Sequence, residues 1–399
     1  MAIQRFKTAA CKTFGVAVCI AMVLGAGALT LPVNAQAEDQ TSTSSGSSTS
    51  GVTASTAASW VNSDVQVIAF QQTWNTIAKE CKDTYGPEGV GYVEVSPPQE
   101  SIKGSSWWTS YQPVSYKLDS KLGTEAEFKN MITVCKAQGV GIIADAVMNQ
   151  TTGTDAAKAA DQTGVAGTKY NGKTGTYPGF TGSRNQYPGG VTAADFHNCT
   201  KNISDYTKQD EVQNCRLSSM WDWDTSSAKV QDILSDYLAD LYKKGVVGFR
   251  IDAAKHINTN DLAAIKQQMA RKVGKSADQI YWIQETIGNS SEAKEIQPNN
   301  YYQNGEVTEF GFKSEMNQKF KGKIAELKGL SGRLIPSAHA NAFVTNWDTE
   351  RQDGTLTYKD GSRYQLANAF LLGYGYGTPR LLSDYKFGDD QAGHDSGAP

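Results

Sequence analysis

Eight short apolar runs, most of them separated by amphipathic stretches, constrain the fold of this chain more than any other feature. Strands that alternate with helices are typical of parallel sheets, because each crossover needs a helix to carry the chain back. Eight such units predict an α/β fold of the closed (β/α)8 barrel type, the TIM barrel. No G-x-G-x-x-G follows the first run, which argues against a doubly wound dinucleotide fold. The predicted strands are Val65–Phe70, Val90–Val95, Val140–Met148, Val246–Ile251, Tyr281–Ile287, Val307–Phe310, Ala342–Asn346 and Arg380–Tyr385.

The stretches between these runs show helical periodicity. In Ser226–Lys244, apolar residues recur every three or four positions and form one face, and the preceding Asp224 and Thr225 are good capping residues. The predicted helices are Thr124–Gln138, Ser226–Lys244, Asn260–Val273, Phe312–Leu330 and Arg363–Leu372.

The connection after the third strand is too long for a loop. It runs for about 75 residues, whereas structureless loops in compact domains seldom exceed roughly 15. We therefore expect an inserted domain at residues 150–222, which divides the barrel into residues 59–149 and 223–399. The sequence ends soon after the eighth run, so we expect an eighth helix to be missing.

The N-terminus resembles a secretion signal. A basic start precedes an apolar stretch over residues 14–31 and an A-x-A motif at residues 35–37, so we expect a signal peptide at 1–37. A membrane anchor is the alternative, but small residues interrupt the apolar stretch. Residues 38–58 are nearly all Ser, Thr, Gly and Ala, which predicts a flexible linker. The sequence thus predicts a secreted, extracellular protein.

Charge and composition exclude some partners. The net charge is −3 and Lys and Arg form no long run, so we expect neither nucleic acid nor a membrane as a partner. We also expect a monomer. Eight Trp and eighteen Tyr suit the apolar faces of sugar rings, although core packing explains them equally well.

Four cysteines remain after the predicted signal peptide. An even number in an oxidising compartment predicts disulfides, and sequence alone allows three pairings. A zinc site is disfavoured because no C-x-x-C spacing occurs. These cysteines are Cys81, Cys135, Cys199 and Cys215.

Polar residues follow several of the predicted strands, at the barrel end where catalytic groups gather. Arg250 and Asp252 point to the same side, so the cation favours an ionised Asp252. Glu285 follows three apolar residues, which predicts desolvation, a raised pKa and a general-acid role. With Asp348, these groups fit a retaining glycosidase; a metal site or a solvated rim of charges is the alternative.

Four segments resemble the short motifs of the α-amylase family of glycoside hydrolases, in the order in which that family has them. The similarity covers residues 64–399, is closest to secreted actinobacterial and animal-type members, and extends to Ser96–Gln99 and Trp107–Tyr116. The four motifs are Asp145–Asn149, Gly248–His256, Ile283–Thr286 and Phe343–Asp348.

The resemblance implies a role for each catalytic carboxylate. Asp252 would be the nucleophile, Glu285 the acid and base, and Asp348 the group that stabilises the oxocarbenium-like transition state. Core packing remains the alternative for the aromatic residues among the implied substrate contacts. Those contacts are Trp107, Trp108, Tyr111, Gln112, Gln150, Arg250, Lys255, His256 and Trp347.

The resemblance also implies bound ions and a disulfide pattern. Calcium would dock the inserted domain, although hydrogen bonds across the junction would explain the same residues. A chloride site is the further implication, with an ordinary ion pair as the alternative for Arg380. The pairs Cys81–Cys135 and Cys199–Cys215 match the family. The calcium ligands would be Asn149, Gln213, Asp222 and His256, and the chloride ligands Arg250, Asn346 and Arg380.

Two departures from the family affect the expected activity. The family has histidine where this chain has Gln150 and Trp347, and both histidines bond the sugar that is attacked. The leading hypothesis is a calcium-dependent α-amylase that hydrolyses starch-like α-1,4-glucans internally. The alternatives are a glucan-binding relative with weak or no catalysis, and a transglycosylase or glucosidase of the same family.

Overall fold

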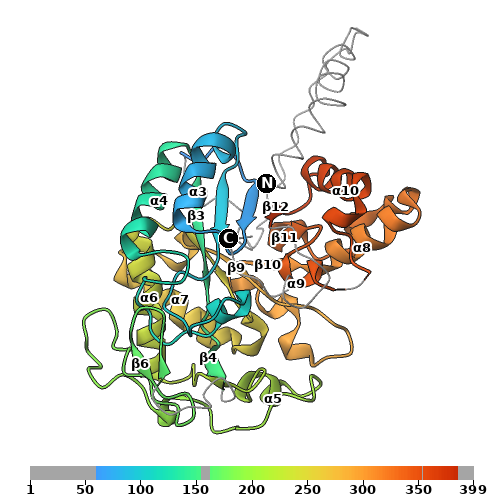
Figure 1. The fold of residues 1–399 in the computed structure, drawn as a ribbon. Helices are drawn as coiled ribbons and strands as arrows, with labels where there is room; N and C mark the ends of the chain where they lie inside the picture. The colour runs from blue at the N-terminus through green and yellow to red at the C-terminus, as the bar shows by residue number, and fades with distance from the viewer. Residues whose placement is uncertain (1–59, 154–161, 353, 385–399) are drawn as a thin grey trace, which may run out of the picture.

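The barrel closes through eight parallel strands. The computed structural model describes residues 60–153, 162–352 and 354–384, so the predicted signal peptide and the predicted linker both lie outside the described residues. Strand order around the barrel is β1-β12-β11-β10-β9-β8-β3-β2, which confirms the predicted (β/α)8 architecture (Figure 1). The strands are β1 (Gln66–Ala69), β2 (Tyr92–Val95), β3 (Gly141–Ala146), β8 (Gly248–Ile251), β9 (Tyr281–Gln284), β10 (Glu306–Glu309), β11 (Ala340–Phe343) and β12 (Thr378–Ser383).

Helices cover the outside of this barrel (Figure 1). The amphipathic pattern of α6 is confirmed, because all six apolar residues of its predicted face are buried: Val230, Ile233, Leu234, Tyr237, Leu238 and Leu241. None of the helices in the described ranges has the length and apolar character needed to cross a bilayer. The helices are α3 (Trp74–Glu80), α4 (Glu125–Ala137), α5 (Gln209–Asn214), α6 (Ala228–Lys244), α7 (Thr259–Lys272), α8 (Phe310–Lys321), α9 (Trp347–Glu350) and α10 (Ser362–Gly373).

Some predicted boundaries were wrong. Helix α8 ends at Lys321, before Gly322, and two short 3-10 helices replace the predicted continuation to Leu330. Helix α6 begins at Ala228, two residues later than predicted, and its N-cap is Ser227; the predicted capping residue Asp224 instead accepts from the backbone N–H of Ser226 in the preceding turn. The expectation that an eighth helix is missing concerns the residues after 384, which lie outside the described residues.

The long connection between β3 and α6 forms small elements of its own, gathered below the barrel in Figure 1. Strand β4 (Gln150–Gly153) pairs antiparallel with β7 (Met220–Asp222), and β5 (Gln162–Thr163) pairs with β6 (Lys169–Tyr170). One buried apolar cluster continues from the barrel into this segment through Tyr177, Phe196 and Trp223.

Two disulfides secure these parts. Cys199–Cys215 closes a loop within the long connection, and Cys81–Cys135 joins α4 to the π-helical turn Cys81–Tyr85 after α3. Both pairings agree with those that the family resemblance implied.

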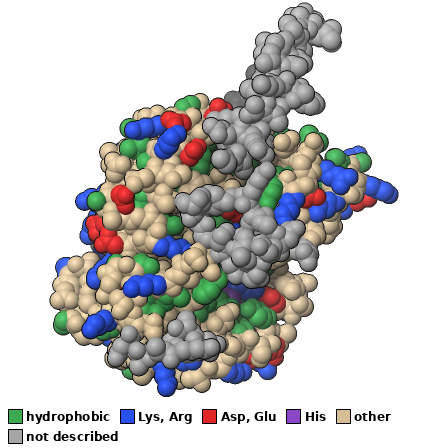
Figure 2. Space-filling model, in the orientation of Figure 1, with side chains coloured by type: hydrophobic (Ala, Val, Ile, Leu, Met, Phe, Trp, Pro, Cys, Tyr) green, Lys and Arg blue, Asp and Glu red, His purple; other side chains and the backbone are tan. Residues whose placement is uncertain are grey.

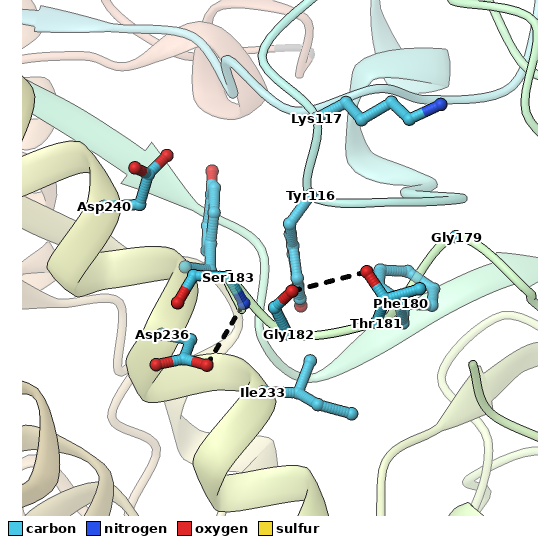
Figure 3. A pocket seen from close by; sticks show the side chains of 11 residues that line it. Tyr116, Lys117, Gly179, Phe180, Thr181, Gly182, Ser183, Ile233, Asp236 and Asp240 are labelled. Carbon is cyan, nitrogen blue, oxygen red and sulfur yellow. Dashed lines mark hydrogen bonds between the residues drawn. The ribbon is translucent and has the colours of Figure 1, made fainter. Parts of the chain in front are cut away.

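A carboxylate on α6 anchors the long connection to the barrel. Asp236 accepts from the backbone of Ser183 at 3.1 Å and from the amide of Gln186, and Lys272 of α7 lies 2.8 Å from its other oxygen. A cavity of about 210 Å³ lies beside this contact (Figure 3). Its aromatic walls are Tyr116, Phe180 and Tyr237.

Candidate active site

Strand register brings the predicted catalytic residues to one end of the barrel. Asp252 and Glu285 follow directly after β8 and β9, and the backbone N–H of Glu285 donates to the carbonyl of Ile251 at 3.0 Å. The register between β3 and β8 places Asp145 opposite Arg250. The carboxyl ends of neighbouring parallel strands therefore carry the polar groups of this site.

The guanidinium of Arg250 contacts three carboxylates. Its Nη1 lies 2.8 Å from Asp145 and 2.7 Å from Asp252, and its Nη2 lies 2.6 Å from Glu285. Burial lowers the pKa of Arg250, but the surrounding negative charges outweigh burial and raise that pKa well above its usual value. Arg250 therefore stays charged and holds the carboxylates in fixed positions.

Asp252 is buried against this cation. Burial raises the pKa of Asp252, and the charge of Arg250 opposes the rise. Arg250 thus lowers the pKa of Asp252 as expected, but burial has the larger effect and the net result is a raised pKa. The side-chain amide of Gln150 also donates to Asp252, at 3.1 Å, and to the carbonyl of Tyr111.

Glu285 is held by two donors. One oxygen contacts Arg250 and the other accepts from the backbone N–H of Ala253 at 3.0 Å. Ala253 has a φ of 48°, a left-handed conformation that costs an L-residue energy and turns its N–H toward Glu285. The predicted desolvation of Glu285 is confirmed by its 13% side-chain exposure.

Asp348 completes the group from the first turn of α9. Burial raises its pKa to about 7; the charge of Glu285 adds to the rise and Arg250 opposes it. Because the charges of Glu285 and Asp252 both act on Asp348, the three predicted catalytic carboxylates share one site.

Trp347 lies beneath this site rather than facing a substrate. It is 2% exposed and stacks on Phe70 with 5.1 Å between ring centres. The guanidinium carbons of Arg250 and Arg380 lie 4.9 and 5.8 Å from the centre of its ring. The indole therefore packs against two cations, and the substrate contact of Trp347 stays a prediction.

The other predicted aromatic contacts differ in exposure. Trp108 is 40% exposed, whereas Tyr111 is buried and donates its hydroxyl to Asp145 at 2.8 Å. Trp107 packs against Phe70. Of these three rings, Trp108 is the one with substantial area free for a ligand.

Three predicted contacts join the barrel to neighbouring segments. Gln112 accepts from the backbone of Gly153 at 2.9 Å, and Lys255 lies 2.7 Å from Glu292. His256 is buried, which lowers its pKa to about 4. These side chains have internal partners or are enclosed, and their contact with a substrate stays a prediction.

The predicted calcium ligands occur as two sets. The Asn149 side chain lies near Asp222, and its buried amide nitrogen has no hydrogen-bond partner in the described chain. Helix α5, which carries Gln213, packs on the 3-10 turn Ala254–His256, where His256 Nδ1 lies 3.2 Å from the carbonyl of Val212.

The predicted ligands are oxygen donors, the type of ligand that calcium prefers. Burial raises the pKa of Asp222 to about 6, and a cation would offset that burial. His197 Nδ1 lies 2.7 Å from Asp222 and stabilises the same carboxylate. Among the described residues no group of three or more His, Cys, Asp or Glu side chains is arranged for a metal, so this site would depend on amide and carbonyl oxygens.

The predicted chloride ligands have internal partners. Arg380 forms an ion pair with Glu94, each 1% exposed, and Asn346 accepts from the backbone of Thr349 as the N-cap of α9. The Nε atoms of Arg250 and Arg380 are buried without a hydrogen-bond partner among the described residues. The ion pair that was the alternative explanation of Arg380 is therefore present.

Three residues of this site were not predicted from the sequence. Asp145 was noted only as the first residue of one of the four motifs, and Glu94 was not singled out. A charged residue within the apolar run Val90–Val95 was the available signal for Glu94. Nothing in the sequence marks Ala253 as left-handed.

Most of the chain is similar to known proteins. The family model for the alpha-amylase catalytic domain matches residues 107–372. An alpha-amylase of Streptomyces violaceus is 40% identical over 333 residues, which cover 83% of this chain and 54% of the relative. An alpha-amylase of Aeromonas hydrophila is 39% identical over 81% of this chain and 69% of its own.

A solved structure agrees with these matches. A mutant of alpha-amylase I from Eisenia fetida, in complex with maltohexaose, superimposes with a TM-score of 0.74 at 31% identity; the match covers 83% of this chain and 68% of that one. The chain spans about half the length of the first curated relatives that it matches.

Proposed function

The chain belongs to the alpha-amylase family, and we propose that it is a retaining hydrolase of α-1,4-glucosidic bonds in starch-like glucans. The observation that supports this best is that Asp252, Glu285 and Asp348 lie together near Arg250 at one end of the barrel. The Eisenia fetida relative binds maltohexaose, which supports a glucan as the ligand here.

Two displacements at one sugar carbon would give the reaction. Asp252 attacks the anomeric carbon while Glu285 protonates the departing glycosidic oxygen, which leaves a glycosyl ester on Asp252. Glu285, now ionised, takes a proton from water, whose oxygen attacks the same carbon and frees Asp252. Arg250 keeps Asp252 in position, and Asp348 stabilises the positive charge that develops on the sugar.

Calcium belongs to this proposal. Asn149, Asp222 and the carbonyls of Gln213 and His256 would hold it, and the ion would tie the residues 150–222 to the barrel as an inserted domain. The described contacts of Asn149 with Asp222 support the set.

The location and the oligomeric state that we propose are those expected from the sequence. The two disulfides support an oxidising compartment and hence secretion. Basic and acidic side chains are interspersed on the face of the molecule in Figure 2, which supports a neutral partner over nucleic acid. We propose a monomer.

A second candidate is a glucan-binding relative with little catalysis. The observation that favours it is the contact of Gln150 with Asp252, which uses the amide that would otherwise bond the sugar. Trp347 is buried as well, so the site lacks both donors that the family's histidines supply. Hydrogen bonds to that sugar contribute several kcal/mol in the transition state.

Release of reducing sugar from soluble starch in calcium buffer separates these candidates. We expect release by the wild-type protein and none by Asp252→Asn, while the exposed-site variant Asp278→Asn keeps full activity. A folded wild-type protein that binds a starch column and releases no sugar would instead establish the binding role. Chromatography of the products distinguishes hydrolysis from glucosyl transfer.

A further inference from the structure

A second buried ion pair lies beneath the catalytic carboxylates. Glu94 of β2 and Arg380 of β12 contact each other, and each side chain is 1% exposed. On its other side, the guanidinium of Arg380 lies 5.8 Å from the ring centre of Trp347, which Arg250 also covers at 4.9 Å. Glu94, Arg380, Trp347 and Arg250 therefore form a continuous path through the barrel to the active site.

Both cations on this path already have anionic partners. Arg380 is paired with Glu94, and Arg250 is paired with Asp145, Asp252 and Glu285. The charge of Glu94 contributes to the raised pKa of Asp145, after burial and the charge of Asp252. A further anion beside Arg380 would be repelled by Glu94 and would lose its hydration, so a halide fits there poorly as long as Glu94 is present.

We propose that Glu94 is the built-in counter-anion of Arg380, which makes the active site independent of chloride and fixes the base on which Trp347 packs. Arg380 is a buried cation, and a buried cation without a partner is strongly destabilising. Glu94 removes that cost from within the chain. Its role is positional, because it acts on Asp348 through Arg380 and the neighbouring Trp347 and touches no reacting atom.

The same geometry indicates what happens without this carboxylate. The variant Glu94→Gln keeps the shape of the side chain and removes its charge. The buried Nε–H groups of Arg250 and Arg380 then remain as donors beside an uncompensated cation. A small anion would be favoured there, so chloride should bind the variant and not the wild-type protein.

Thermal unfolding and starch hydrolysis are measured in sodium chloride and in sodium gluconate of equal ionic strength. Gluconate is too large to enter a buried site, so it controls for screening. For the wild-type protein we expect the same melting temperature and rate in both salts. For Glu94→Gln we expect a lower melting temperature in gluconate, partial recovery in chloride, and a several-fold rise in rate with chloride.

Two variants serve as controls. Glu94→Gln with Arg380→Gln removes both charges and should lose the chloride response. Glu306→Gln changes another buried carboxylate of the barrel, one bound by the neutral donors Tyr281 and Thr378, and should not acquire a response.

Chloride that activates or stabilises the wild-type protein overturns the proposal, and so does a Glu94→Gln protein that ignores chloride in both measurements. If Glu94→Gln fails to fold, the wild-type titration still decides the matter. Of the two measurements, only the rate of starch hydrolysis rests on the proposed hydrolase function. A chloride-dependent melting temperature in Glu94→Gln alone would support it even if the wild-type protein released no sugar.

Discussion

Replacing Asp348 by asparagine is expected to stabilise the folded protein above neutral pH while it removes activity. Burial raises the pKa of this carboxyl to about 7 from its ordinary value of 3.8. One pKa unit corresponds to about 1.4 kcal/mol, so a rise from 3.8 to about 7 corresponds to roughly 4 kcal/mol. Asparagine has nearly the same shape and no charge, and therefore avoids this cost.

The pH dependence has a definite sign. Between pH 3.8 and about 7 the folded state keeps the Asp348 proton that the unfolded state has released, so stability falls as pH rises. The cost is absent below pH 3.8 and complete above about 7. The advantage of Asp348→Asn should therefore be roughly 1.5 kcal/mol at pH 5 and roughly 4 kcal/mol at pH 8. These values are upper ones, because Asp348 is not fully buried.

Urea unfolding of both proteins at pH 5 and pH 8, in constant saturating calcium, measures this difference. Asp278→Asn, at an exposed position, is the matched control and should show no pH-dependent gain. An Asp348→Asn protein that gains the same stability at both pH values, or none at pH 8, would show that this carboxyl is not held in a desolvated, negatively charged site. Activity should be lost in the same variant, since stability and function oppose each other at such sites.

Three further predictions address other parts of the molecule. Gln150→Ala removes a hydrogen bond to the charged Asp252, so kcat should fall about tenfold or more while the melting temperature changes little; an unchanged kcat would contradict the assigned contact. Replacing Cys81 and Cys135 by alanine should cost about 4 kcal/mol of unfolding free energy in urea, because their separation of 54 residues closes a long loop. Removal of calcium by a chelator should lower the melting temperature, and Asp222→Asn should abolish that response; an equal response in both proteins would place the ion elsewhere.

The architecture was predictable from the sequence because local patterns determine it. A helix such as α6 buries every apolar residue of its predicted face, and the strand that precedes Asp252 was recognisable from its apolar run. The ends of the helices were less predictable, because they depend on which residue turns the chain. Helix α8, for example, ends at Lys321 before Gly322, nine residues before the predicted end at Leu330.

Much of the site chemistry was not predictable, because it depends on contacts between distant strands. Glu94 and Arg380 lie on strands at opposite ends of the described chain, and only barrel closure brings them together. Gln150 was expected to face the sugar, but the register of β4 with β7 and its distance to Asp252 decide its partner. The burial of Trp347 depends likewise on Phe70, which no motif connects to it.

The stereochemistry of the first product tests the central claim most directly. Hydrolysis of soluble starch is followed by proton NMR within the first turnovers, before the anomers of the free sugar equilibrate. The double displacement at Asp252 and Glu285 predicts that the new reducing end appears as the α-anomer. First appearance of the β-anomer would contradict the covalent role of Asp252 and the retaining mechanism built on it.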